Sequence, residues 1–336
     1  MNRKFSAHWL GSEGVKLFHF SRSAWSLAAI ADGLARVLGR KPTFAFPEYM
    51  CSPSLWPLRR NGANLLFYPI DPVTLQPDYR NCDNLPPFDI FVLVHYFGKP
   101  ADAAKAGQWA RSRGALLVED AAHVLHAIDG VGEHGDFVLY SPRKLLPIPD
   151  GAFLVVRTPS LSLVPEMELA VSRLGRREPS ALLWKLRRSR LARFIPEPPA
   201  QAPVFESDEQ EMPMAKTPRM SATAAALIAK MDLAVVAKKR QQNAKAVLAA
   251  MAARSGWTPL FQPGDDWIAH RVPIRCESPD TAKRFFLQLR EAGLIAETWP
   301  ALALGIEASS SAHRLRQTLL FLPCHQHLNT ANLGMI

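Results

Sequence analysis

The chain has 336 residues, which is long for one hydrophobic core and predicts a larger and a smaller domain. Hydrophobic residues make up 48% of it, an ordinary share for a globular protein, and no run approaches the roughly 18 apolar residues of a membrane span. The formal net charge is +10, but zinc-finger spacing, an RNP-like aromatic pattern and a helix-turn-helix signal are missing, so we expect no nucleic-acid partner. Four cysteines without metal spacing, and a start without a signal peptide, predict a metal-free cytoplasmic protein.

The first part of the chain predicts alternating strands and helices. A strand at 15–20 precedes a helix that opens at residue 21 with small polar residues and continues with apolar residues at helical spacing. Further strands are expected at 44–46, 65–68 and 89–95. The last of these has a fully apolar centre, which is typical of a parallel sheet.

The most informative stretch is 116–151, where two apolar runs lead to charged side chains. The run at 115–118 ends in two carboxylates, of which Asp120 is the second, as a buried strand ends next to a functional site. The run at 137–140 leads to Lys144 on a proline-rich and therefore stiff loop. A lysine amine can form a Schiff base with the aldehyde of pyridoxal phosphate (PLP), and a carboxylate can pair with its pyridinium nitrogen. Spacing alone leaves the alternative of two solvated or salt-bridged side chains.

A divergent basic segment is expected at about 160–215. Its positive charge is concentrated at 173–193, and a helix is predicted at 180–194 with leucines on one side and arginines elsewhere. One interpretation is a solvated helix face on the larger domain. The alternatives are peripheral contact with anionic lipid, and arginines that reach a substrate phosphate.

The remainder of the chain predicts a long helix and a small domain. The Ala-rich helix is expected at 220–251 and would complete a larger domain of residues 1–250. Within a smaller domain at 251–336, we expect a β-α-β unit. Its elements are a strand at 267–275, a helix at 280–292 ended by Gly293, and a strand at 294–296.

Segments along nearly the whole chain, in order, resemble the DegT/DnrJ/StrS-type sugar aminotransferases. The strand-end motif at 118–123 and the lysine loop at 141–144, followed by Asp150 and Gly151, resemble that family's motifs. Further similar segments lie at 46–49, 62–63, 71–75, 94–102, 218–227 and 322–328. The resemblance implies an aspartate-aminotransferase-like α/β fold of type I. Its large domain would hold a mostly parallel sheet, and its small C-terminal domain would be α+β.

The resemblance also implies roles for residues around the cofactor. Lys144 would hold PLP and shuttle the proton during the reaction. Asp120 would keep the ring nitrogen protonated, and His123 would lie against the phenolic oxygen. The helix that opens at residue 21 would cradle the cofactor phosphate, with Ser23 supplying a hydroxyl. Arg22 would add a cation there or face solvent.

Other positions are expected to contact substrate. Arg219, at the start of the long helix, would meet substrate or a second subunit. His95 follows a strand, where it is either a structural hydrogen-bonding group or a substrate contact. Thr217 stands where the family has an asparagine that crosses to the partner subunit's phosphate.

Two further positions depart from the family pattern. Cys51 stands where an aromatic ring covers the pyridine, and Tyr49 would fill that place or serve in the core or at the rim. Leu139 replaces a phosphate-binding serine, and Ser141 is the nearest hydroxyl that could take over. The residues for covalent chemistry, Lys144 and Asp120, are therefore present, while several expected contacts to the cofactor phosphate and ring are altered.

The function that this resemblance implies is transfer of an amino group, from glutamate, to a nucleotide-linked keto sugar in amino-sugar or polysaccharide biosynthesis. The family works as a homodimer with shared sites. One alternative is a PLP-dependent sugar dehydratase or lyase, although Lys144 argues against the dehydratase branch in which histidine replaces the lysine. The other alternative is a regulatory or scaffold protein that no longer binds the cofactor.

Overall fold

The computed structural model describes residues 8–9, 15–157, 160–173, 218–264, 266–330 and 333. A seven-stranded sheet forms the centre of the larger domain, in the order β1-β7-β6-β5-β4-β2-β3. Its strands are β1 (Lys16–Phe20), β2 (Thr43–Pro47), β3 (Asn64–Tyr68), β4 (Ile90–Val94), β5 (Leu116–Ala121), β6 (Phe137–Tyr140) and β7 (Ala152–Val156). The strands from β6 to β3 pair in parallel, and β7 runs antiparallel to both of its neighbours. The expected fold class, with a mostly parallel sheet, is confirmed.

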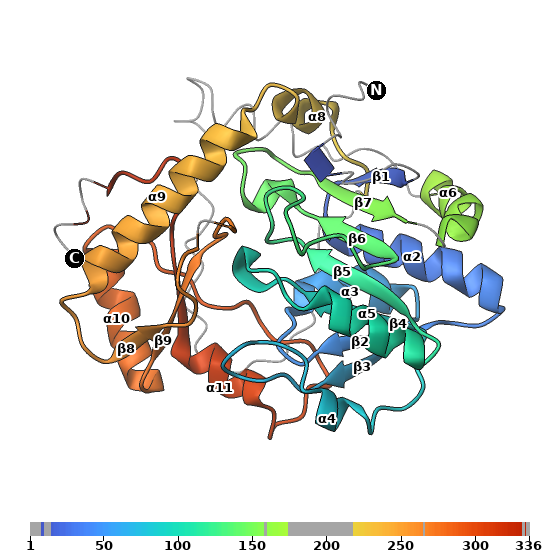
Figure 1. Cartoon of the computed structure of the whole chain (residues 1–336), viewed down its shortest axis with the longest axis horizontal. Coiled ribbons are helices and arrows are strands. Elements are labelled where there is room, and N and C mark those ends of the chain that lie inside the picture. The colour runs from blue at the N-terminus through green and yellow to red at the C-terminus, as the bar shows by residue number, and fades with distance from the viewer. Residues whose placement is uncertain are drawn as a thin grey trace.

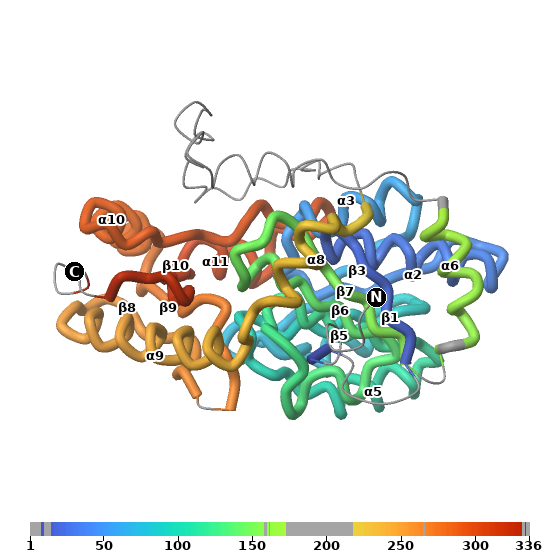
Figure 2. The backbone as a smooth tube through the Cα atoms, turned by 90° about the horizontal axis from the view of Figure 1, so that it is seen from above, coloured from blue at the N-terminus to red at the C-terminus, as the bar shows by residue number. Residues whose placement is uncertain are grey.

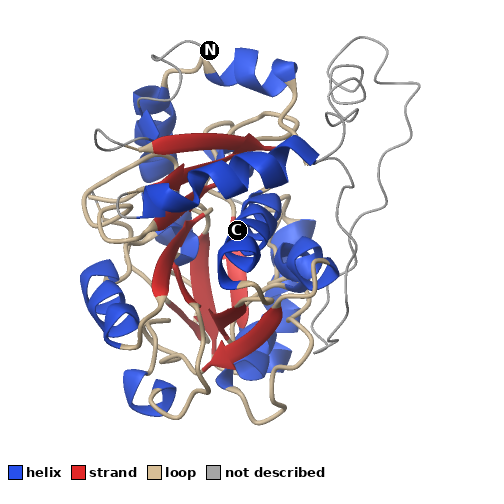
Figure 3. Ribbon diagram, turned by 90° about the vertical axis from the view of Figure 1, so that its right-hand side faces the viewer, coloured by secondary structure: helices blue, strands red, loops and turns tan. Residues whose placement is uncertain are grey.

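Helices cover both faces of this sheet (Figures 2 and 3). On one side lie α2 (Ser23–Leu38) and α3 (Ser52–Arg60), and on the other lies α5 (Ala103–Ser112). Because helices shield both faces, the central strands are apolar throughout: β4, β6 and β7 are buried at every position. The helix α6 (Val164–Arg173) packs on α2, and the short α4 (Tyr79–Cys82) follows β3.

The predicted long helix is two helices. α8 (Ala222–Ile228) and α9 (Leu233–Met251) are separated at Asp232, whose backbone is extended. The Asp232 carboxylate accepts hydrogen bonds from the amides of Ala234 and Val235 at 3.0 and 3.1 Å, which caps α9 and starts a new helix. The prediction of one continuous helix was wrong because the Ala-rich composition concealed this capping residue.

The small domain contains an antiparallel sheet in the order β10-β9-β8. Its elements are β8 (Trp257–Pro259), β9 (Val272–Cys276), α10 (Pro279–Glu291), α11 (Ser311–Thr318) and β10 (Leu319–Leu322). The expected helix is confirmed, and Gly293 follows it with a φ of 82° that suits a helix end. The strand expected at 267–275 begins only at Val272. The strand expected at 294–296 is absent, because the partner of β9 is β10, from farther along the chain.

The helix α9 extends from beside α8 to the small domain (Figure 1). Its fully buried Arg240 donates hydrogen bonds to the carbonyl of Leu145, at 3.3 Å, and to those of Ala269 and His270, at 3.1 and 2.5 Å. One guanidinium therefore joins the lysine loop to the segment that enters the small-domain sheet. Within the described residues, no helix is both long enough and apolar enough to cross a lipid bilayer.

Candidate active site

The parallel strands β4, β5 and β6 end at one edge of the sheet, and candidate side chains follow each of them. Asp120, on β5, is 8% exposed, and its Oδ1 accepts a hydrogen bond from the Ala122 amide at 2.9 Å. Its Oδ2 has no donor among the described residues. Burial raises the pKa of the Asp120 carboxyl, and the Lys144 ammonium opposes this shift. One carboxylate oxygen is therefore available to a positively charged partner.

Lys144 ends the 3₁₀ turn η2 (Pro142–Lys144), which directly follows β6. Its backbone N–H donates to the Ser141 carbonyl at 2.9 Å, and Pro142 fixes the start of the turn. The side chain is partly buried, and its amine has no hydrogen-bond partner among the described residues. Burial lowers the pKa of this amine, while Cys51 and Asp120 oppose the shift. The lowered pKa favours the neutral amine, which is the form that attacks a carbonyl.

His123 follows β5 and directs one ring nitrogen into the protein. Its Nδ1 accepts a hydrogen bond from the Phe97 amide at 3.2 Å, and its ring stacks on His270 with centroids 4.4 Å apart and planes 8° from parallel. Burial holds the pKa of His123 well below its usual value, and the charges of Lys144 and Arg271 act in the same direction. The imidazole is therefore neutral, and its proton is on Nε2. That N–H can donate to an oxygen at the sheet edge.

His95 is completely buried and bonded through both ring nitrogens. Nδ1 accepts from the Ala101 amide at 2.9 Å, so Nε2 carries the proton and donates to Glu119 at 3.0 Å. Glu119 also accepts from three amides of the loop at 132–135, at 2.6 to 2.9 Å. These contacts give His95 the structural role that was one of its two expected roles. Neither ring nitrogen is available to a substrate.

The first turn of α2 and the start of β7 lie beside the lysine loop. Arg22 is the residue before α2; its backbone is extended, and no side chain caps the helix. Ser23 is 9% exposed at the first helical position. The Gly151 amide donates to the Ser21 carbonyl at 2.9 Å, and Gly151 has a φ of 136° that side chains disfavour. The expected phosphate cradle and the lysine loop are therefore neighbours.

Tyr49 lies in the core beside Trp299. It is completely buried and stacks on Trp299, with centroids 4.3 Å apart and planes 22° from parallel. This contact gives Tyr49 the core role that was its alternative. Cys51 precedes α3, with its Sγ 2.9 Å from the Ser54 hydroxyl, and is close enough to Lys144 to influence its pKa.

The remaining candidate residues have different surroundings. Leu139 lies in the core, and the Ser141 Oγ is enclosed without a hydrogen-bond partner. Arg219 is exposed and donates to the carbonyls of Val171 and Ser172 at 3.4 and 3.3 Å, on α6. Thr217, the helix expected at 180–194 and the rest of the basic cluster beyond residue 173 lie outside the described residues.

A family model for the DegT/DnrJ/EryC1/StrS aminotransferases matches residues 52–334. The chain belongs to this family. The match includes Asp120, His123 and Lys144, whereas Arg22 and Tyr49 precede its first residue.

Solved structures of aminotransferases share the fold of this chain, and one curated relative is similar over part of it. An aminotransferase from Streptoalloteichus hindustanus has a TM-score of 0.71 at 21% identity, over 99% of this chain and 86% of that one. A Helicobacter pylori aminotransferase involved in the biosynthesis of pseudoaminic acid has a TM-score of 0.71 at 16% identity, over 98% and 87%. A dTDP-4-dehydro-2,3,6-trideoxy-D-glucose 4-aminotransferase from Saccharopolyspora spinosa is 29% identical over 109 residues, which is 30% of this chain and 28% of that relative.

Three groups at the sheet edge fit PLP, the cofactor that aminotransferases use. Asp120 leaves one oxygen for a pyridinium nitrogen, and His123 leaves an N–H for a phenolic oxygen. Lys144 supplies an amine of lowered pKa. None of these three groups has a hydrogen-bond partner among the described residues, as expected of groups that contact a ligand.

Sequence reasoning missed two residues of this site. Arg143 is partly buried beside Lys144, and its Nε is enclosed without a hydrogen-bond partner among the described residues. His270 covers one face of His123. The position of Arg143, directly before Lys144 in the sequence, was a signal that could have identified it. His270 comes from the small domain, and nothing in its local sequence indicates that it would reach the site.

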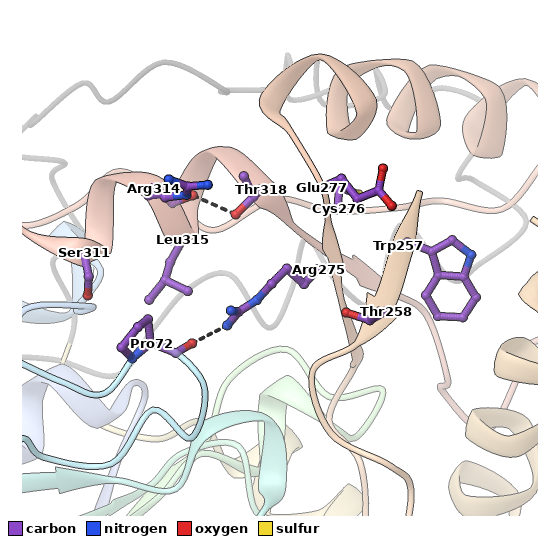
Figure 4. Close-up of a pocket in the computed structure, with 10 residues that line it drawn as sticks. All are labelled: Pro72, Trp257, Thr258, Arg275, Cys276, Glu277, Ser311, Arg314, Leu315 and Thr318. Carbon is purple, nitrogen blue, oxygen red and sulfur yellow. Dashed lines mark hydrogen bonds between the residues drawn. The ribbon is translucent and has the colours of Figure 1, made fainter. Parts of the chain in front are cut away.

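A separate cavity of about 400 Å³ lies where the small domain meets the turn after β3 (Figure 4). Its lining residues are Pro72, Trp257, Thr258, Arg275, Cys276, Glu277, Ser311, Arg314, Leu315 and Thr318. Arg275 points across it and donates to the Pro72 carbonyl, which joins the small domain to the larger one. Asp120, His123 and Lys144 do not line this cavity, so it is distinct from the candidate active site.

Proposed function

We propose that this protein is a PLP-dependent aminotransferase that transfers an amino group, with glutamate as donor, to the keto group of a nucleotide-linked sugar. The observation that carries the proposal is the meeting of Asp120 Oδ2, His123 Nε2 and the Lys144 amine at one sheet edge, each without a partner among the described residues. Family membership and the sugar aminotransferases among its relatives support it.

When bound, PLP would supply an electron sink that makes a proton on the adjacent carbon of an amine removable. Lys144 would anchor the cofactor through its amine and, once an amino donor displaces it, take up and return a proton at Nζ as general base and then general acid. Burial suits it to this role, because a lowered pKa brings the amine closer to the working pH.

Asp120 and His123 would fix the electronic state of the ring. The Asp120 carboxylate would hold a proton on the ring nitrogen, a charge-assisted contact in a site that is largely closed to water. His123 would donate from Nε2 to the phenolic oxygen. Its own orientation is fixed by the Phe97 amide and by the stack on His270.

The amino acceptor is proposed from the relatives, since the Saccharopolyspora spinosa relative is named as acting on a dTDP-linked 4-keto sugar. We also propose a homodimer in the cytoplasm, as the family resemblance implies. Arg219 is exposed and could then face a second subunit. Light scattering of the purified protein would test the dimer: the expected mass is twice that of one chain, and a monomer at working concentrations would contradict it.

The direct test is amino transfer with labelled donor. Purified protein would be incubated with PLP, ¹⁵N-glutamate and a panel of dTDP- and UDP-linked 4-keto sugars, and products would be analysed by mass spectrometry. A ¹⁵N-labelled amino sugar with wild-type protein, and none with Lys144→Ala, is the expected result. Wild-type protein that releases no 2-oxoglutarate from glutamate and aminates no sugar would contradict the proposal.

A further inference from the structure

Arg143 forms no hydrogen bond and no ion pair among the described residues, and Asp150 acts on it through its charge alone. The Arg143 side chain is partly buried, its Nε is enclosed, and none of its nitrogens donates a hydrogen bond to a described residue. Guanidinium groups in such positions nearly always bind an anion or a carbonyl, because an unpaired buried donor is costly. The structure therefore holds a recognition group whose target is not part of the described chain.

Arg22, which follows β1, lies near Arg143. β7 lies between β1 and β6, with Phe20 opposite Ala152 and Tyr140 opposite Phe153. β1 and β6 are therefore parallel and end at the same edge, two strand spacings or roughly 10 Å apart. The Arg22 guanidinium donates to the Ser21 carbonyl at 2.9 Å and is close enough to Arg143 for its charge to act on it. Burial lowers the pKa of Arg143 to about 9, and the charge of Arg22 adds to this shift.

The surrounding polar groups also favour an anion. The first turn of α2 lacks a side-chain cap, and the Ser141 Oγ is enclosed without a partner. The carboxylate to weigh against this is Asp150, whose charge acts on Arg143; its Oδ1 accepts from the Ser221 amide at 2.8 Å, and its Oδ2 is buried without a hydrogen-bond partner among the described residues. Asp150 neither hydrogen-bonds to Arg143 nor forms an ion pair with it. The Lys144 amine lies on the same loop, and the charge of Asp120 acts on it.

We propose that Arg22 and Arg143 together bind the phosphate group of the cofactor. The proposal rests on the proposed function, because the anion next to a lysine that holds PLP is the cofactor's own phosphate. A dianion between two guanidinium groups removes their mutual repulsion and gives the Arg143 donors an acceptor, which they lack among the described residues. It also explains how the chain can do without a hydroxyl at position 139, where Leu139 belongs to the core.

The test measures cofactor binding rather than turnover. Equilibrium dissociation constants for PLP and for pyridoxal, which lacks the phosphate, would be determined by absorbance titration of cofactor-free protein. The variants are Arg143→Gln, Arg22→Gln and Arg143→Lys. The last keeps the positive charge but cannot form the two parallel hydrogen bonds of a guanidinium group. Arg36→Gln is the matched control, since Arg36 is exposed on α2, the helix that Arg22 precedes, and forms a 3.9 Å ion pair with Glu166. Circular dichroism would verify that each variant is folded.

We expect Arg143→Gln and Arg22→Gln each to weaken PLP about tenfold or more, with pyridoxal unchanged. Arg143→Lys should fall between wild type and Arg143→Gln, and Arg36→Gln should match wild type. Inorganic phosphate should raise the melting temperature of cofactor-free wild type more than that of either glutamine variant, a result that does not depend on Lys144.

Two results would overturn the inference, and they differ from failure of the proposed function. Unchanged PLP affinity in folded Arg143→Gln and Arg22→Gln would show that the arginines do not bind the phosphate, while PLP on Lys144 would still stand. Equal weakening of PLP and pyridoxal would show that the variants disturb the pocket in general. Wild-type protein that binds neither compound would remove both the inference and the proposed function.

Discussion

Replacing Asp120 by Asn removes one charge with little change in shape. The amide can keep the hydrogen bond that Oδ1 accepts from Ala122, at 2.9 Å, so the end of β5 should remain in place. What disappears is the negative charge on the oxygen that has no donor in the protein. The effect of Asp120→Asn on catalysis should therefore be electrostatic.

Two magnitudes follow from this environment. Loss of one preorganised charge partner in an enclosed site typically lowers the maximal rate by about 10²–10³-fold. Stability should change in the opposite direction or not at all. Burial raises the pKa of Asp120 above its unfolded value, so its contribution to stability is fully present only below the unfolded pKa, near 4, and is lost as pH rises through the folded pKa. At pH 7 the carboxylate is a cost to the cofactor-free protein that Asn removes.

The assay is a comparison of wild type and Asp120→Asn at pH 7, with thermal unfolding of the cofactor-free proteins and amino transfer from ¹⁵N-glutamate with saturating PLP. We expect a melting temperature at or above that of wild type and a maximal rate at least a hundredfold lower. Near-normal turnover of Asp120→Asn with cofactor bound would remove Asp120 from the mechanism. A large fall in the melting temperature would refute the view that the Asp120 carboxylate destabilises the cofactor-free protein at pH 7.

Two further predictions concern the neighbours of Asp120. Glu119→Gln should lower the free energy of unfolding at pH 7 by about 3 kcal/mol, measured by denaturant titration, because the new NH₂ group would face the His95 and Gly132 donors that a carboxylate oxygen now accepts from. Burial raises the pKa of Glu119, but hydrogen bonds from His95 and backbone amides outweigh this effect and hold the pKa below its usual value. The difference in stability between wild type and Glu119→Gln should therefore shrink as the pH falls below about 4. A difference that stays constant with pH would contradict this. His123→Phe should keep a ring against His270 but lose the Nε2 donor. We expect the maximal rate to fall about tenfold and the visible absorption of bound cofactor to shift. An unchanged absorption spectrum would argue against a contact between His123 and the cofactor.

Local sequence was sufficient to place a residue whose position depends on its own strand. Asp120 and Lys144 each follow an apolar run that forms a buried strand, and parallel pairing brings both ends to one edge. Helix α10 was equally clear, because its cap, its apolar spacing and Gly293 are contiguous.

Sequence was insufficient where distant segments decide the outcome. The role of Tyr49 depends on Trp299, 250 positions later, whose ring stacks on it and keeps it in the core. The partner of β9 is β10 rather than the segment at 294–296, and only tertiary pairing distinguishes the two. His270 likewise reaches His123 only because the two domains meet at this point.

The central claim is that Lys144 holds PLP, and borohydride reduction followed by peptide mapping tests it most directly. Purified protein incubated with PLP should be yellow, and reduction should fix the cofactor to the peptide that contains Lys144, at one cofactor per chain. Lys144→Arg treated in the same way should give no labelled peptide. Label on a different lysine, or no label in wild type with PLP in excess, would contradict the account.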